Sequence, residues 1–131
     1  MFECLIMGDS IAVGTHMFKK ECVLIGKGGI NSWQFNNMYN NKDFTAESVI
    51  ISLSTNDHKG VKTEKELIAM REKVHGKRVY WILPAIKPEM QEIVKKLANQ
   101  YGDVVLPIKH LQADGVHPSW AGYKDLVEKT K

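Results

Sequence analysis

Short apolar runs alternate with longer amphipathic stretches along this chain. The runs have the length of strands and lie at residues 3–7, 21–26, 48–53, 78–83 and 104–108. Stretches with helical periodicity lie between and after them, at residues 10–18, 31–39, 63–75, 88–101 and 119–129. Residues 49–51 and 79–83 are continuously apolar, which is typical of strands covered on both faces. This alternation predicts an α/β fold, with a parallel sheet, right-handed crossovers and helices on both sides.

Several helix ends carry their own local signals. Thr63, followed by Glu66, predicts a capping box at the start of the third helix. Pro88 suits the first turn of the fourth helix, and Gly102 suits a left-handed residue just after its end. Ser119 is expected to cap the last helix with its hydroxyl.

Length and charge limit the classes of function. The chain has 131 residues, which predicts a single domain over residues 1–131. The net charge is +3, but the lysines form no basic stripe interleaved with aromatic side chains, so nucleic-acid binding is not expected. No apolar run approaches the length needed to span a bilayer.

The two cysteines, Cys4 and Cys22, both lie in apolar runs. We expect them to be reduced, buried and packed like small hydrophobic residues. A disulfide between neighbouring strands is the alternative. No Cys-x-x-Cys pair is present, which argues against a zinc site of that kind.

Polar motifs follow four of the predicted strands. In chain order they are Gly8-Asp9-Ser10, Gly28-Gly29, Asn56, and Asp114 with His117. The carboxyl ends of parallel strands meet at one edge of a sheet, where ligands bind in folds of this class. We therefore expect all four segments to converge on one site.

The residue types in these motifs match the needs of a nucleophilic hydrolase. A serine hydroxyl such as that of Ser10 is a weak nucleophile and needs a neighbouring base. His117 is the candidate base, and Asp114, three residues earlier, can accept a hydrogen bond from the other ring nitrogen. Pro118 stiffens the turn after the histidine.

The same motifs, in this order, resemble the SGNH hydrolases, also called the GDSL esterase/lipase superfamily. The resemblance implies a three-layer α/β/α flavodoxin-like sandwich, whose five-stranded parallel sheet has the order 2-1-3-4-5, and hydrolysis of esters by a serine. It also implies an oxyanion hole made by the backbone N–H groups of Ser10 and Gly29 and the side-chain amide of Asn56. One departure is Ser54, which stands where the family usually has glycine.

The substrate expected from the sequence is a short acyl ester, with an O-acetyl group on a carbohydrate as the specific expectation. Residues 54–62 and 84–88 leave little room for a lid, so the site should be open and shallow. Trp33 and Gln34 follow Gly29 closely and are candidates to line the substrate cleft; packing of Trp33 into the core is the alternative. No cofactor and no metal are expected.

Other functions stay open from the residues alone. A lysophospholipase or thioesterase of the same fold is the nearest alternative, followed by a non-catalytic binding module. Residues 26–29 are compatible with a phosphate cradle of a nucleotide binder, and His110, Asp114 and His117 with a loose metal site. The beginning of the chain lacks an export signal, so we expect a cytoplasmic protein, with a phage-encoded origin as a further possibility. The oligomeric state is not indicated.

Overall fold

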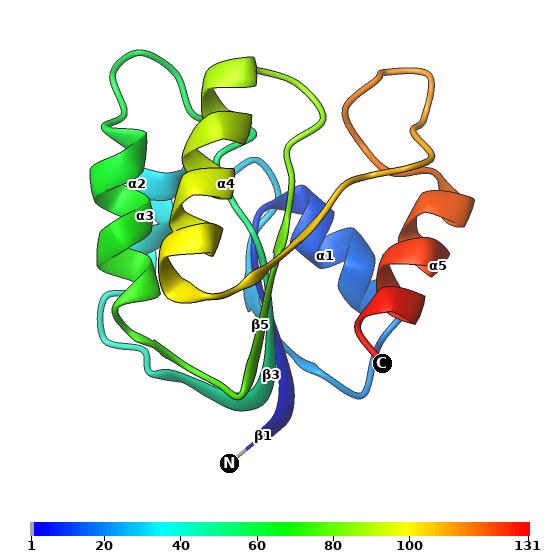
Figure 1. Ribbon diagram of the computed structural model, residues 1–131, viewed down its shortest axis with the longest axis horizontal. Coiled ribbons are helices and arrows are strands. Elements are labelled where there is room, and N and C mark those ends of the chain that lie inside the picture. The colour runs from blue at the N-terminus through cyan, green and yellow to red at the C-terminus, as the bar shows by residue number, and fades with distance from the viewer. Residues whose placement is uncertain (1) are drawn as a thin grey trace.

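A parallel sheet forms the middle layer of the molecule in the computed structural model, which describes residues 2–131 (Figure 1). Its strands are β1 (Phe2–Gly8), β2 (Val23–Gly26), β3 (Phe44–Ser52), β5 (Arg78–Ile82) and β6 (Val104–Leu106). They lie side by side in the order β2-β1-β3-β5-β6, and each pair is parallel. This is the order 2-1-3-4-5 expected from the sequence, so the predicted fold class is confirmed.

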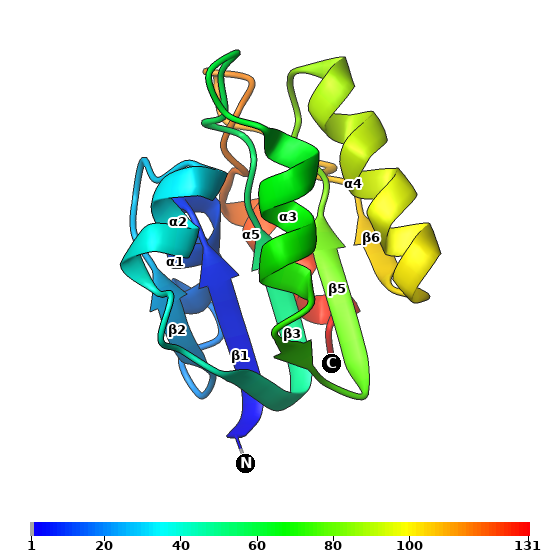
Figure 2. The same ribbon diagram turned by 90° about the vertical axis from the view of Figure 1, so that its left-hand side faces the viewer.

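Helices cover both faces of the sheet. On one face are α1 (Ser10–Met17) and α5 (Trp120–Lys129), and on the other are α2 (Ser32–Met38), α3 (Thr63–Arg71) and α4 (Pro88–Tyr101) (Figure 2). Two separate hydrophobic cores result. Alternate residues of β1 enter different cores: Leu5 and Met7 pack with α2, α3 and α4, whereas Ile6 packs with α1 and α5. Burial on both faces explains why the strands read as continuous apolar runs.

The boundaries differ from the prediction in several places, among them β3, which begins at Phe44 and not at residue 48. Residues 63–75 were predicted to be one helix, but α3 ends at Arg71 and residues Val74–His75 form a short strand, β4, beside the start of β3. The side chain of Val74 is buried there, and burial in a strand cannot be told from helical burial by local periodicity. The last strand ends at Leu106, because Pro107 has no N–H to continue the ladder.

The predicted capping box of the third helix is wrong. The hydroxyl of Thr63 donates to Asp57 Oδ2 at 2.8 Å, and Glu66 Oε1 accepts from the side chain of Asn36. Lys62 precedes the helix without a side-chain capping bond. Both polar side chains are used to join separate segments instead of capping their own helix.

The other helix ends follow the sequence signals. Pro88 is the first residue of α4, Gly102 follows it with a φ of 73°, and the Ser119 hydroxyl accepts a hydrogen bond from Gly122 at the start of α5. A capping box that the sequence analysis missed lies at α2, where the side chains of Asn31 and Gln34 bond to each other's backbone N–H.

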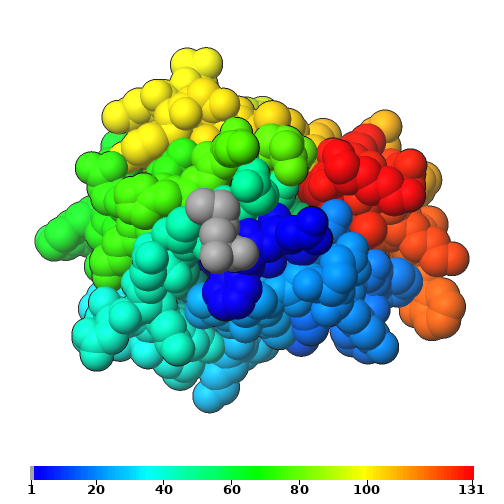
Figure 3. Space-filling view, turned by 90° about the horizontal axis from the view of Figure 1, so that it is seen from below, coloured from blue at the N-terminus to red at the C-terminus, as the bar shows by residue number. Residues whose placement is uncertain are grey.

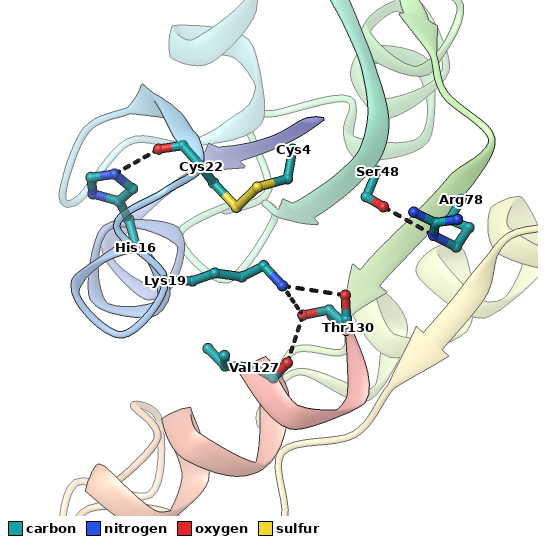
Figure 4. The surroundings of a disulfide bond; sticks show 8 residues. All are labelled: Cys4, His16, Lys19, Cys22, Ser48, Arg78, Val127 and Thr130. Atoms are coloured by element: carbon teal, nitrogen blue, oxygen red, sulfur yellow. Dashed lines mark hydrogen bonds between the residues drawn. A yellow bond between two sulfur atoms is a disulfide. The ribbon is translucent and has the colours of Figure 1, made fainter. Parts of the chain in front are cut away.

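Cys4 and Cys22 form a disulfide, so the prediction of two reduced thiols is wrong (Figure 4). The cause is the register of the sheet. Leu5 lies opposite Val23 in the parallel pair β1–β2, which brings the preceding residues together with their Cα atoms 4.7 Å apart. The cellular location stays a prediction, and such disulfides are more typical of oxidising compartments than of the cytoplasm.

Reduction of this disulfide is expected to lower the free energy of unfolding by about 3 kcal/mol, because the cystine closes a loop whose ends are 18 residues apart. Urea denaturation with and without a phosphine reductant measures the change. The double variant Cys4→Ala/Cys22→Ala is the control, and its midpoint should not respond to the reductant. Two free thiols in the untreated folded protein would contradict the assignment.

The first described residues of β1 and the end of α5 lie at the end of the sheet opposite the polar motifs (Figure 3). A cleft of about 550 Å³ lies there, with Cys4, Lys19 and Arg78 among its walls. Lys19 is only 8% exposed, and its Nζ donates to the backbone and side-chain oxygens of Thr130. These bonds tie the end of α5 to the turn after α1, which fixes the helix that follows the loop of His117.

Candidate active site

The polar motifs lie at the carboxyl edge of the sheet, at the top of the molecule in Figure 1. Ser10 is the first residue of α1, directly after β1. The glycine loop follows β2, the loop of Asn56 follows β3, and the loop of Asp114 and His117 lies between β6 and α5. The topology of the sheet therefore gathers segments that are more than 100 residues apart in sequence.

A chain of hydrogen bonds joins Ser10, His117 and Asp114. The Ser10 Oγ lies 2.9 Å from His117 Nε2, and His117 Nδ1 lies 2.7 Å from Asp114 Oδ2. With Nδ1 carrying its proton toward the carboxylate, Nε2 is free to accept the proton of the serine. This geometry suits a serine nucleophile with a base held in one tautomer.

Several backbone contacts join the two sides of the loop that carries His117. Leu111 and Pro118 form an isolated antiparallel bridge, and the N–H of Gln112 donates to the carbonyl of His117 at 2.8 Å. Asp114 Oδ1 accepts from the backbone N–H groups of Val116 and His117. These two bonds and the bond to the ring lower the pKa of Asp114 to about 2, so its carboxylate is charged at neutral pH.

Asp9 directly precedes Ser10 and caps the start of α1 with its side chain. Its Oδ1 accepts from the Ile11 N–H and the Ser52 hydroxyl, and its Oδ2 has no partner within residues 2–131. Burial raises the pKa of this carboxyl from 3.8 to about 6, against the opposing effect of the Ser52 hydroxyl. Because this pKa is higher in the folded state, Asp9 makes folding less favourable as pH rises from about 4 to about 6.

Two backbone N–H groups at this edge are free to bind an anion. The N–H of Ser10 belongs to the first turn of α1 and has no partner inside the helix. The N–H of Gly29 makes no hydrogen bond within the part of the chain described. Gly29 has a φ of +79°, a backbone conformation that favours glycine.

Asn56 reaches the glycine loop from the next strand. Its side-chain Nδ2 donates to the carbonyl of Ile30 at 3.1 Å, which leaves the second N–H of that amide unused by this bond. A methyl group on Gly28 would lie 3.9 Å from the Cβ of Ser10. The glycine loop therefore lies near Ser10 and is bonded to Asn56 through the carbonyl of Ile30.

Asp57 is a buried residue of this edge that the sequence analysis did not single out. Its Oδ1 accepts from the Ser32 N–H at 2.8 Å, and its Oδ2 accepts from the Thr63 hydroxyl. It therefore fixes the loop of Asn56 to α2 on one side and to α3 on the other. Its position next to Asn56 was the only signal available, because both partners are distant in sequence.

Ser54 occupies strained backbone. Its φ is 101°, its side chain is fully buried, and its Oγ has no partner within residues 2–131. The conformation is one that glycine adopts without strain, which explains why a glycine is usual here in the family that the sequence resembles. The loop keeps its turn, since the N–H of Asp57 donates to the Ser54 carbonyl at 3.0 Å.

Ser54→Gly is expected to raise the free energy of unfolding by about 1 kcal/mol, because relief of the positive φ outweighs the extra freedom of the unfolded chain. Chemical denaturation of both proteins measures the difference. Ser54→Ala is the matched control, since it removes the unpartnered hydroxyl but keeps the Cβ, and it should gain less. Equal or lower stability of the glycine variant would contradict this account of the strain.

The two candidate substrate-binding residues, Trp33 and Gln34, lie in different surroundings. Trp33 is 54% exposed, so the alternative in which it packs into the core is wrong. Gln34 lines a small pocket of about 180 Å³ together with Gly28, Gly29 and Met38. Trp33 is not among the residues lining that pocket.

The metal and nucleotide alternatives gain no support. No group of three metal-ligating side chains occurs within residues 2–131. The pocket beside Gly28 and Gly29 is smaller than the roughly 300–1,000 Å³ that ligand sites usually occupy.

Within residues 2–131, no helix is both long and apolar enough to cross a membrane.

Comparison with known proteins identifies solved structures with a similar fold. No protein-family model and no curated protein matches this chain. A GDSL-like lipase from Bacteroides thetaiotaomicron superposes with a TM-score of 0.71 at 19% sequence identity, over 98% of this chain and 85% of the lipase. This chain has the GDSL-like fold. A second structure with this fold, named as an acylhydrolase from Bacteroides fragilis, gives a TM-score of 0.68 at 22% identity, over 98% and 84% of the two chains.

Proposed function

We propose that this protein is a serine ester hydrolase of the SGNH type, with Ser10, His117 and Asp114 as its catalytic triad. The observation that carries the proposal is the hydrogen-bond chain from the Ser10 hydroxyl through His117 to Asp114, at 2.9 Å and 2.7 Å. The GDSL-like fold and the hydrolase names of its structural neighbours support the same class of reaction.

The reaction follows from the positions of these groups. The Ser10 Oγ attacks the ester carbonyl while His117 Nε2 takes its proton, and His117 then protonates the departing alcohol. The N–H groups of Ser10 and Gly29 and the amide of Asn56 would stabilise the negative oxygen of the tetrahedral intermediate. Water, activated by the same histidine, releases the acyl group and restores Ser10.

The proposed substrate is a short acyl ester, with an O-acetylated carbohydrate as the specific candidate. The site is open, because the side chains of His117 and Asp114 are 35% and 45% exposed. The pocket beside Gly29 suits a small group, and the exposed indole of Trp33 is available to stack on a sugar ring. A larger cavity of about 570 Å³ between residues 57–63 and α4 is lined by none of the triad or oxyanion residues.

Hydrolysis of nitrophenyl acetate by the wild type and by Ser10→Ala tests this proposal. The variant should lose nearly all enzymatic turnover, whereas Ser48→Ala, which removes a hydroxyl of β3 that bonds to Arg78, should keep it. Nitrophenyl octanoate should be hydrolysed more slowly than the acetate. Equal rates for the wild type and Ser10→Ala would refute the serine mechanism.

A further inference from the structure

Lys87 has an unusual backbone for its residue type. It lies between β5 and α4 with a φ of 62°, in the left-handed region, and it directly precedes Pro88. A residue before proline is disfavoured in helical conformations, and a non-glycine residue with positive φ is strained. Such strain persists where the surrounding contacts impose it, so the contacts of this side chain are informative.

The side chain of Lys87 bonds to the loop of Asn56 at two points. Its Nζ donates to the carbonyl of Thr55 at 2.8 Å and to the carbonyl of Asp57 at 2.7 Å, the residues on either side of Asn56. No carboxylate within residues 2–131 lies in ion-pair distance of this amine. Bonds from a charged donor are shorter and stronger than neutral ones, so both carbonyls are firmly held.

The rest of the loop is fixed on its other side. The Asp57 carboxylate bonds to α2 and α3, and the Asn56 amide donates to Ile30. These contacts set where the loop lies, whereas the two carbonyl bonds set the orientation of the Thr55–Asn56 and Asp57–His58 peptide groups, which lie before Asn56 and after Asp57. Loss of the Lys87 amine would free those peptide groups to rotate, and the amide of Asn56 with them.

We propose that Lys87 is a positioning residue, which holds the backbone around Asn56 so that its side-chain amide faces the oxyanion formed at Ser10. This inference rests on the proposed function. Lys87 acts through Asn56 and contacts neither the triad nor the pocket beside Gly29. The two bonds from Lys87, called the clamp below, join the loop after β5 to the loop after β3. No local sequence pattern predicts this contact.

The first test is Lys87→Met, which keeps much of the side-chain length and removes the amine. Loss of one oxyanion donor costs about 100- to 1,000-fold in kcat, and its misplacement should cost about 10- to 100-fold, with KM changed less than about twofold. Lys73→Met is the matched control, because Lys73 also donates to a backbone carbonyl, that of Asn40, at an exposed position of another loop. Its kcat should equal that of the wild type.

A double-mutant cycle separates positioning from a general loss of structure. Asn56→Ala should cost more than Lys87→Met, and the double variant should be no slower than Asn56→Ala alone, because Lys87 has no oxyanion donor left to position. If the kcat losses of the two single variants multiplied in the double variant, the proposal would be overturned. A wild-type kcat for Lys87→Met would overturn it as well.

Hydrogen exchange gives a readout that needs no activity. The Asp57 N–H, which donates to Ser54, should exchange faster in Lys87→Met, whereas Ile50 in the centre of β3 should keep its protection. Unchanged exchange at Asp57 would show that the clamp does not hold the loop and would overturn the proposal. If Ser10→Ala were as active as the wild type, the esterase mechanism would fail, while faster exchange at Asp57 would still show the clamp itself.

Discussion

His117→Gln is expected to lower kcat for nitrophenyl acetate by about 10⁶-fold, the size of the loss found when the base of a serine triad is removed. The reason is that His117 Nε2 is the group in hydrogen-bond contact with the Ser10 hydroxyl, at 2.9 Å. A glutamine amide can form hydrogen bonds at this position but cannot take the proton of the serine. Steady-state kinetics with matched protein concentrations measure the loss.

Two controls sharpen this prediction. The double variant Ser10→Ala/His117→Gln should be no slower than either single variant, since the two groups act as a unit. His110→Gln, in the same loop, should retain wild-type kcat, because within residues 2–131 only the backbone carbonyl of His110 forms hydrogen bonds. A His117→Gln enzyme within about tenfold of the wild type would contradict the role of His117 as base.

Asp114→Asn is expected to lower kcat by about 10⁴-fold. The asparagine can keep the bonds that Oδ1 accepts from Val116 and His117, so the loop should retain its shape. It replaces Oδ2, which accepts from His117 Nδ1 at 2.7 Å, with an NH₂ group that disfavours the productive tautomer. Kinetics of Asp125→Asn provide the control, since Asp125 pairs with Lys129 on α5.

The pKa of Asp114 gives this prediction a pH dependence. Since the pKa is lowered to about 2, the carboxylate stays charged from neutral pH down to well below pH 4. Any loss of activity at mildly acidic pH should therefore not come from protonation of Asp114. An Asp114→Asn variant with wild-type kcat at pH 7 would show that the carboxylate is not needed to orient the ring.

The strands and the convergence of the polar motifs could be predicted because they depend on short-range patterns, whereas the sheet order was implied by the resemblance to the SGNH hydrolases. A continuous apolar run such as residues 49–51 identifies a central strand, and parallel strands bring their carboxyl ends together. Ser10 and His117 were therefore expected to meet although 107 residues separate them, and the structure brings them into contact. The local caps at Pro88, Gly102 and Ser119 were predictable for the same reason.

The remaining features depend on register and on contacts between loops. The disulfide of Cys4 with Cys22 follows from how β1 pairs with β2, which the composition of either strand does not specify. Thr63 has the spacing of a helix cap, but the nearby carboxylate of Asp57 takes its hydroxyl. The clamp from Lys87 to the loop of Asn56 likewise forms only when two distant loops are folded side by side.

The central claim is that Ser10 is the nucleophile, and covalent labelling by a fluorophosphonate followed by peptide mass spectrometry tests it most directly. The account predicts one adduct per folded chain, located on Ser10, and no adduct on His117→Gln or on protein unfolded in urea. Failure of the folded wild type to react, or an adduct on any other residue with Ser10 unmodified, would contradict it.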